Sequence, residues 1–301
     1  MVPTLAGVVL LIFFLFKLFG GDPAQILAGQ IASQEQIDSI RRELGLDQPW
    51  YVQLWIFVKE ITTFNWGQSW ITREQVSHIF LTRLPATLTI TIPILFLEAA
   101  LAIPTAMLVA YYRGTLLDRT IVAICVAAMS ISFLVYIIVG QYLFGFQLGW
   151  FPVQGWSDSF WKNLVTYAPL PILLAALVGL APQTRLYRSF FLDETKSDYV
   201  RTARAKGLTE PAILRKHVLR NALVPVVTNI SLIIPGVFVG SFLLEIFFSI
   251  PGLGREIYLA VNRSDYPVIQ AVTIYLAVLT MLINLAADVL YSFVDPRIQL
   301  R

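Results

Sequence analysis

The sequence predicts an all-α integral membrane protein with about six transmembrane helices and an extracytoplasmic insertion after the first helix. Of its 301 residues, 57% are hydrophobic and only 14% are charged, and the mean hydropathy is +0.70. The surface of an ordinary soluble domain carries more charge than this. Several windows of about 20 residues contain almost no charge, which is the length of helix that crosses a hydrocarbon layer of roughly 30 Å. Barrel strands would be about half as long and would alternate, so helices are expected.

The apolar windows divide residues 1–301 into one membrane domain whose long polar insertion covers residues 20–84. An even number of spans places both termini on the same side of the membrane. A removable signal peptide is the alternative for the first span, but no basic residues precede it and no convincing cleavage site follows it. The missing basic flank leaves open whether the natural chain starts upstream of Met1. The spans are expected at residues 2–19, 86–110, 120–144, 164–182, 224–248 and 268–290.

Lysine and arginine are unevenly divided between the connections, and cytoplasmic loops are the ones that retain them. With both termini in the cytoplasm, the inner connections hold most of the basic residues, whereas the insertion at 20–84 offsets its few with acidic ones. The richest inner connection is the loop at 184–225. It contains the basic segment, defined here as residues 198–225, "DYVRTARAKGLTEPAILRKHVLRNALVP". The basic segment is therefore expected to be cytoplasmic.

The basic segment has a helix, glycine, helix pattern. Residues 193–206 are expected to form a helix that ends at Gly207, because glycine adopts the left-handed conformation common after a helix. A second helix is expected to follow Thr209 as its N-cap, with Pro211 in its first turn, where the missing N–H is tolerated. Pro225 is expected to mark the entry to the fifth span.

The two expected helices present distinct faces. Ala203 and Gly207 are four residues apart, so they form a patch of small residues where another surface can approach the backbone. Lys216 and Arg220 share a face of the second helix. The alternative is a solvated basic loop that holds the topology and touches anionic lipid, which composition alone favours. An apolar stripe is expected opposite the basic face, formed by Leu214, Val218 and Ala222.

The basic segment resembles the "EAA" loop of the membrane subunits of bacterial ABC importers, in the variant of the dipeptide, oligopeptide and nickel branch. Ala203 and Gly207 fit the pattern, whereas Arg201 and Thr202 replace its glutamate and alanine, a departure that this branch usually shares. Together the motifs cover nearly the whole chain and are typical of the B-type permease. They include "GGDPA" from Gly20, "LGLDQPWYVQ" from Leu44, "RLPATL" from Arg83, "YRGTLLDR" from Tyr112, "LGWFPVQGW" from Leu148, "FFSIPGLGREI" from Phe247, "DYPVIQ" from Asp265 and "DPRIQL" from Asp295.

The resemblance implies the type I ABC importer permease fold in a bacterial cytoplasmic (inner) membrane. It implies a non-catalytic subunit that forms half of a path for short peptides, beside a homologous second permease, two ABC ATPase subunits that bind ATP and Mg, and an extracytoplasmic substrate-binding protein. Nickel or another small solute is the alternative cargo within this class. The residues expected to couple this chain to the ATPases are Ala203, Arg204, Lys206, Gly207, Leu208, Arg215, Lys216 and Arg220.

Several kinds of site are not expected in this chain. It has no Gly-x-x-x-x-Gly-Lys-Ser/Thr run, so it does not cradle a nucleotide in that way. Cys125 is its only cysteine, and His78 and His217 are its only histidines, which argues against a disulfide or a cysteine- or histidine-based metal centre. No catalytic residue, cofactor-binding residue, metal ligand or nucleic-acid partner is predicted. Membrane lipid is expected as a partner.

Acidic residues in or beside the spans need a reason, because a carboxylate in lipid is costly. Glu245 and Asp288 lie near span ends, where pairing with basic or backbone groups is the favoured interpretation. Glu98 is more central, and three roles stay open for it: proton or ion relay, substrate contact, or structural partner. An ion-coupled secondary transporter would explain Glu98 but leaves the basic segment unexplained.

Overall fold

The computed structural model describes residues 2–19, 21–28, 32–63 and 65–294, with side chains described as far as residue 286. In this part of the chain the regular structure is helical, apart from one isolated β-bridge between Gln68 and Gln75. Among the described residues, four helices are long and apolar enough to cross a membrane, a fifth candidate is a bent helix pair, and Pro3–Leu18 is a shorter apolar helix. Each apolar window predicted from the sequence falls on one of these.

The chain divides into two compact units, the first made of Met1–Pro85 with Gly252–Arg301. Its core includes Val76, Ile79 and Val268. Asp265 of the "DYPVIQ" motif is buried, and it accepts hydrogen bonds from the Ser69 hydroxyl at 2.5 Å and the Trp70 N–H at 3.0 Å. The helices of this unit are α1 (Val2–Phe19), α2 (Pro23–Ala28), α3 (Gln34–Glu43), α4 (Trp50–Thr62), the start of α5 (Val76–Tyr111), α14 (Leu253–Asn262) and α15 (Tyr266–Val294).

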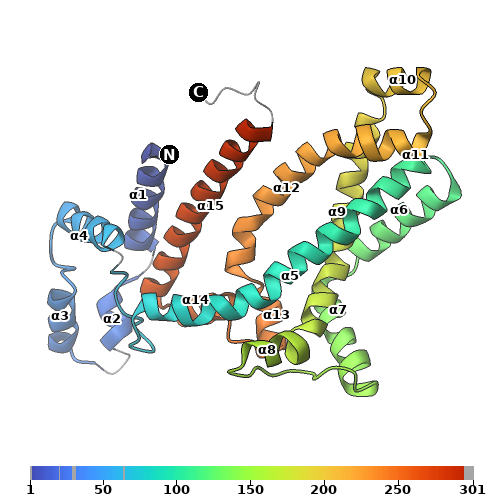
Figure 1. Ribbon diagram of the computed structural model, residues 1–301. Coiled ribbons are helices and arrows are strands. Elements are labelled where there is room, and N and C mark those ends of the chain that lie inside the picture. The colour runs from blue at the N-terminus through green and yellow to red at the C-terminus, as the bar shows by residue number, and fades with distance from the viewer. Residues whose placement is uncertain (1, 20, 29–31, 64, 295–301) are drawn as a thin grey trace. The chain divides into compact units, whose positions relative to one another are not determined.

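The second unit, Ala86–Pro251, contains the rest of α5 and the central helices. Helices α10 and α11 lie at one end of it, and α8 and α13 lie at the other (Figure 1). Its helices are α6 (Leu116–Met129), α7 (Phe133–Gly140), α8 (Phe160–Lys162), α9 (Pro169–Glu194), α10 (Asp198–Ala205), α11 (Glu210–Ile213), α12 (Leu219–Val239) and α13 (Phe242–Phe247). Short π-helical turns cover Gln141–Gln147, Asn163–Tyr167 and Leu214–Val218.

The third predicted span is bent, and the expectation of one continuous helix over 120–144 was wrong. Helix α6 ends at Met129, a new helix begins at Phe133, and the two directions differ by 89°. Ser132 precedes the second helix in an extended conformation, as an N-cap residue does. The Ser130 hydroxyl donates to the Val126 carbonyl at 2.9 Å, so a local side-chain bond occupies a carbonyl at the end of the first helix.

The fifth span is also interrupted near its end, at Gly240. This glycine has φ +79°, and a Cβ there would lie 2.2 Å from an oxygen of Glu245, so both its conformation and its surroundings require glycine. Glu245 is fully buried and accepts a hydrogen bond from the Thr87 hydroxyl of α5 at 2.8 Å. The structural role expected for Glu245 therefore has a partner, whereas the side chain of Asp288 lies outside the described residues.

The boundaries around the basic segment differ from those predicted. Helix α9 continues through Pro182 to Glu194, beyond the expected end of the fourth span at residue 182. The next helix begins at Asp198 rather than at residue 193, and the extended residue Ser197 precedes it. Pro225 lies inside α12 and marks no entry, because α11, the π-helical turn and α12 follow one another without a loop.

Candidate functional site

The basic segment folds as two helices around one glycine. Helix α10 covers Asp198–Ala205, and Gly207 follows with φ +78°, in the left-handed region that glycine adopts most readily. Thr209 has extended geometry and precedes α11, whose first turn holds Pro211. These three features agree with the sequence prediction, although the Thr209 side chain makes no capping hydrogen bond.

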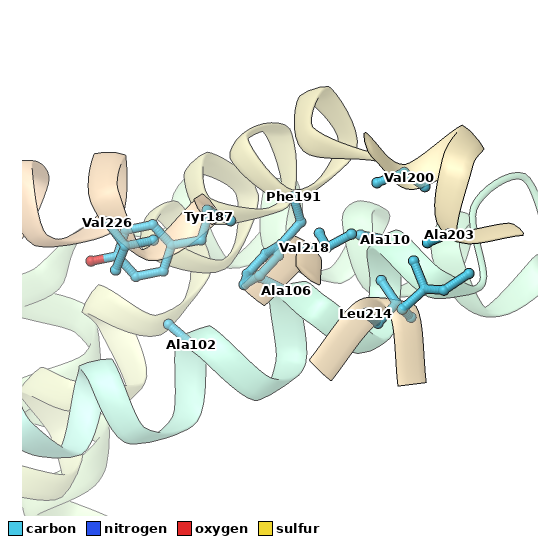
Figure 2. Close-up of a cluster of buried hydrophobic side chains, with 12 residues drawn as sticks. Ala102, Ala106, Ala110, Tyr187, Phe191, Val200, Ala203, Leu214, Val218 and Val226 are labelled. Carbon is cyan, nitrogen blue, oxygen red and sulfur yellow. The ribbon is translucent and has the colours of Figure 1, made fainter. Parts of the chain in front are cut away.

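The inner side of the basic segment is part of a hydrophobic cluster shared with α5 and α9 (Figure 2). Small side chains on one face of α5 leave room for two aromatic side chains of α9, Tyr187 and Phe191, which are almost completely buried. The predicted apolar stripe of the second helix joins this cluster. Its members are Ala102, Ala106, Ala110, Tyr187, Phe191, Val200, Ala203, Ile213, Leu214, Val218, Ala222 and Val226.

Because one cluster joins α10, α11 and α12 to α5 and α9, a displacement of α10 changes the packing of two candidate membrane spans directly. Closely packed interiors transmit strain rather than absorb it. The basic segment is therefore anchored to the membrane helices and is not a loosely tethered loop.

The outer side of the basic segment carries positive charge that is unpaired within the described residues. Lys206, Arg215, Lys216 and Arg220 are exposed, and no ion pair in the described part of the chain involves them. Leu208 is 43% exposed at the tip between the two helices. An exposed apolar side chain in a segment with several exposed cations is the composition of a docking surface with a charged rim.

Ala203 does not lie on this outer side, contrary to the expectation that it forms an exposed patch with Gly207. Only 5% of Ala203 is exposed, and it packs into the shared cluster. Its small size lets α10 approach the rest of the cluster closely. The exposed small residues of the segment are Ala205 and Gly207, and a Cβ at Gly207 would meet no atom within 4 Å.

Arg204 forms an ion pair with Glu210 of the same chain, a contact that was not predicted from the sequence. Its Nε and Nη2 atoms donate to the two carboxylate oxygens of Glu210 at 2.6 and 3.1 Å, across the turn at Gly207. An arginine six residues before a glutamate predicts an ion pair only when a turn is known to lie between the two residues. The fork-shaped contact holds the ends of α10 and α11 together.

One further contact lies at the base of the segment, and another joins helices beside it. The Tyr199 hydroxyl donates to the Glu194 carboxylate, and burial together with this bond raises the pKa of Tyr199. On the neighbouring helices, Arg188 donates through two nitrogen atoms to the buried Asp118, at 2.8 Å in each case. Asp118 is part of the "YRGTLLDR" motif. It also accepts a hydrogen bond from the Gly114 N–H at 2.8 Å, which orders the turn in that motif.

Glu98 lies on α5, away from the basic segment. It lines a cavity of about 290 Å³ in the second unit together with apolar residues of other helices. Its carboxylate rests against Gly179 of α9, where a Cβ would lie 1.9 Å from one carboxylate oxygen. None of the predicted coupling residues lines this cavity. Within the described residues, no group of three or more His, Cys, Asp or Glu side chains could hold a metal ion.

Comparison with known families decides the class of protein. Residues 102–300 match the model described as "Binding-protein-dependent transport system inner membrane component", and residues 2–91 match the model of the corresponding N-terminal region. The chain belongs to this family. The all-helical permease fold and the multi-pass inner-membrane location expected from the sequence are confirmed by this match and by the candidate spans.

Individual relatives agree with the family assignment. The chain is 34% identical to the di/tripeptide transport system permease protein DppB of Pseudomonas aeruginosa, over 99% of this chain and 96% of the relative. It is 35% identical to a putative peptide transport system permease protein of Brucella abortus, with the same two coverages. It is 36% identical to the glutathione transport system permease protein GsiC of Salmonella choleraesuis, again over 99% and 96%.

The fold is also similar to that of a solved transporter. A chain from inward-facing conformations of the MetNI methionine ABC transporter matches with a TM-score of 0.58 at 20% sequence identity, covering 73% of this chain and 97% of that one. At this identity the match shows the fold alone, and the fold of this chain is that of an ABC importer permease. ATPase and binding-protein partners follow for the family in general.

Proposed function

We propose that this chain is one of two membrane subunits of an ATP-driven importer and forms half of its path for short peptides. Relatives named as di/tripeptide, peptide and glutathione permeases support a peptide cargo over nickel. The other members of the complex are a homologous permease, two ATPase subunits that bind ATP and Mg, and an extracytoplasmic binding protein. The chain itself is non-catalytic.

The observation that carries this proposal is the hydrophobic cluster shared by the basic segment, α5 and α9. ATP hydrolysis in a partner can drive transport only if the partner's motion reaches the spans. Docking of the ATPases on the outer side of the basic segment supplies such a route, through Leu208, Gly207 and the cations around them. A loop that only held the topology would need no shared core.

The same proposal sets the orientation. Both termini and the basic segment face the cytoplasm, in keeping with the lysine and arginine distribution. The connection that contains α8 then faces outward, at the opposite end of the second unit from α10 and α11 (Figure 1). The loaded binding protein docks on the extracytoplasmic side, at the end that contains α8. Alternating access follows as ATP closes the ATPase subunits.

Reconstituted vesicles test the proposal. Uptake of a labelled dipeptide or tripeptide is expected only when this chain, the second permease, both ATPases, the loaded binding protein and ATP are all present. Uptake by the permeases alone, driven by an ion gradient without ATP, would instead identify a secondary transporter. Uptake of nickel in place of peptide would contradict the proposed cargo while leaving the importer class intact.

A further inference from the structure

Glu98 faces an otherwise uncharged cavity. The other lining residues come from α5, α7, α9, α12, α13 and the break around Gly240, and Glu98 is the one charged side chain among those described. The volume, about 290 Å³, lies at the lower end of the range of small-molecule sites, which is roughly 300–1,000 Å³. A space of this size suits one end of a small ligand.

The Glu98 carboxylate has no basic partner. None of the ion pairs or hydrogen bonds of the described residues involves its side chain, which lies beside Gly179 of α9. An isolated carboxylate in an apolar membrane interior is costly, and such groups usually pair with an opposite charge or mark a transport path. Glu245, by comparison, is satisfied by Thr87 and fully enclosed.

The part of α9 that lines the cavity adds one acceptor that lacks its usual helical donor. Pro182 has no N–H, so the carbonyl of Val178, a lining residue, lacks the donor that a helix normally supplies four residues later. One turn after Gly179, the Oε1 atom of Gln183 is buried and has no hydrogen-bond partner. The Glu98 carboxylate and the Val178 carbonyl thus belong to residues that line the cavity, whereas Gln183, on the next turn of α9, is not one of its lining residues.

A group that satisfies several acceptors and one negative charge must carry positive charge and more than one N–H. An ammonium group has three donors and fits this description. Short peptides carry one at the amino terminus. A transition metal is a poorer fit, because no cluster of His, Cys, Asp or Glu occurs in the described residues.

We infer that the cavity at Glu98 is a subsite of the transport path that binds the terminal ammonium group of the peptide. Glu98 supplies the charge, and the Val178 carbonyl of α9 supplies a further acceptor. This inference rests on the proposed function, because it assigns a role to one end of the proposed cargo. It makes Glu98 a residue that determines specificity, and neither a proton relay nor a structural partner.

Gly179 provides a second way to test the subsite without removing the charge. A methyl group there would occupy the place of the carboxylate, so Gly179→Ala should push the Glu98 side chain aside. Alanine is a better helix former than glycine, so α9 itself should tolerate the change. Glu98→Gln removes the charge and keeps the shape.

The experiment measures initial uptake in vesicles that contain the full transporter, with binding protein in saturating amounts. The substrates are a tripeptide and its analogue that lacks only the terminal amino group, both first shown by titration to bind the binding protein. Glu98→Gln is expected to lower uptake of the tripeptide about 10- to 100-fold, as for loss of a charge-assisted hydrogen bond, and to leave uptake of the analogue unchanged. Gly179→Ala should shift the ratio in the same direction. The matched control is Glu35→Gln, an exposed carboxylate on α3, which should change neither rate.

Each other outcome is informative. Equal loss of both substrates in the two variants would overturn the inference, since a relay or structural role does not distinguish them, and so would unchanged uptake of both. If Glu98→Gln does not assemble, Gly179→Ala decides between the same two results. Failure of the unmodified transporter to take up either substrate would contradict the proposed function itself.

Discussion

Gly207 connects the two helices of the basic segment, and its backbone explains why glycine stands there. Its φ of +78° is unfavourable for other residues, most of all for β-branched ones, while the space around its missing Cβ is open. Any effect of a substitution inside this chain therefore comes from the backbone. An effect on a docked partner comes from both the backbone and the added bulk.

Gly207→Val is expected to strain the turn by about 1–3 kcal/mol, which a large membrane domain survives, and to displace the docking surface. The variant should insert and pair with the second permease, yet retain the ATPases poorly and lose substrate-stimulated ATP hydrolysis. Gly207→Asn is the control, because asparagine tolerates the left-handed conformation and should restore most of the coupling. Co-purification and hydrolysis rates measure this, and full coupling in Gly207→Val would contradict it.

The ion pair between Asp118 and Arg188 predicts a large effect on stability. Asp118→Asn leaves a partly buried guanidinium without its carboxylate and should lower the free energy of unfolding by about 3–5 kcal/mol. Asp193→Asn removes one partner of the exposed pair between Asp193 and Lys196, whose side chains are 74% and 60% exposed. It should change the free energy of unfolding by less than about 1 kcal/mol. Thermal unfolding of the purified permeases compares the two variants, and equal midpoints would refute the structural role of Asp118.

At the scale of elements, the hydrophobic cluster beneath α10 is the link between the outer surface and the spans. Ala203 lies where this helix meets the cluster, and Ala205 lies on the same helix facing outward. The two alanines therefore separate packing inside the chain from contact with a partner.

Ala203→Leu is expected to overpack the cluster and to cost about 1–3 kcal/mol in the free energy of unfolding. It should also reduce the number of peptides transported per ATP hydrolysed, because α10 no longer sits against α5 and α9 as before. Ala205→Leu should leave stability unchanged and weaken only ATPase binding. If the two variants lose stability equally, the inward position of Ala203 is wrong.

Much of the helical organisation could be predicted from the sequence because it depends on local signals. Apolar windows of sufficient length located the spans, and Gly207, Thr209 and Pro211 located the turn between α10 and α11. The break after Met129 and the interruption at Gly240 were missed, since both lie inside long apolar windows and no charged residue stands at either break. The pairs Arg204–Glu210 and Asp118–Arg188 were missed because they depend on how helices meet.

The position of Ala203 shows the same limit. A small residue beside an exposed glycine fits both an outward socket and an inward contact, and only the packing of α10 into the shared hydrophobic cluster distinguishes them. Glu98 could be singled out from its charge alone. Its role depends on Gly179 and Pro182, which lie more than 80 residues later.

For the whole molecule, the central question is which end of the second unit faces the cytoplasm. Single cysteines at Ser157 and Thr209, in a Cys125→Ser background, should react with an impermeant reagent from opposite sides of the membrane. In right-side-out vesicles Ser157→Cys should be labelled and Thr209→Cys should not. Labelling of both from outside would overturn the proposed topology.

Cross-linking between the tip of the basic segment and an ATPase subunit tests most directly whether this segment couples ATP hydrolysis to transport. A photoactivatable cross-linker on Leu208→Cys, in the Cys125→Ser background of the assembled transporter, should give a product with an ATPase subunit, and the yield should fall when Gly207→Val is added. The same group on Ser157→Cys should give none. A product of Leu208→Cys with the binding protein, or no ATPase product from a complex that still hydrolyses ATP in response to substrate, would contradict the claim that this segment couples ATP hydrolysis to transport.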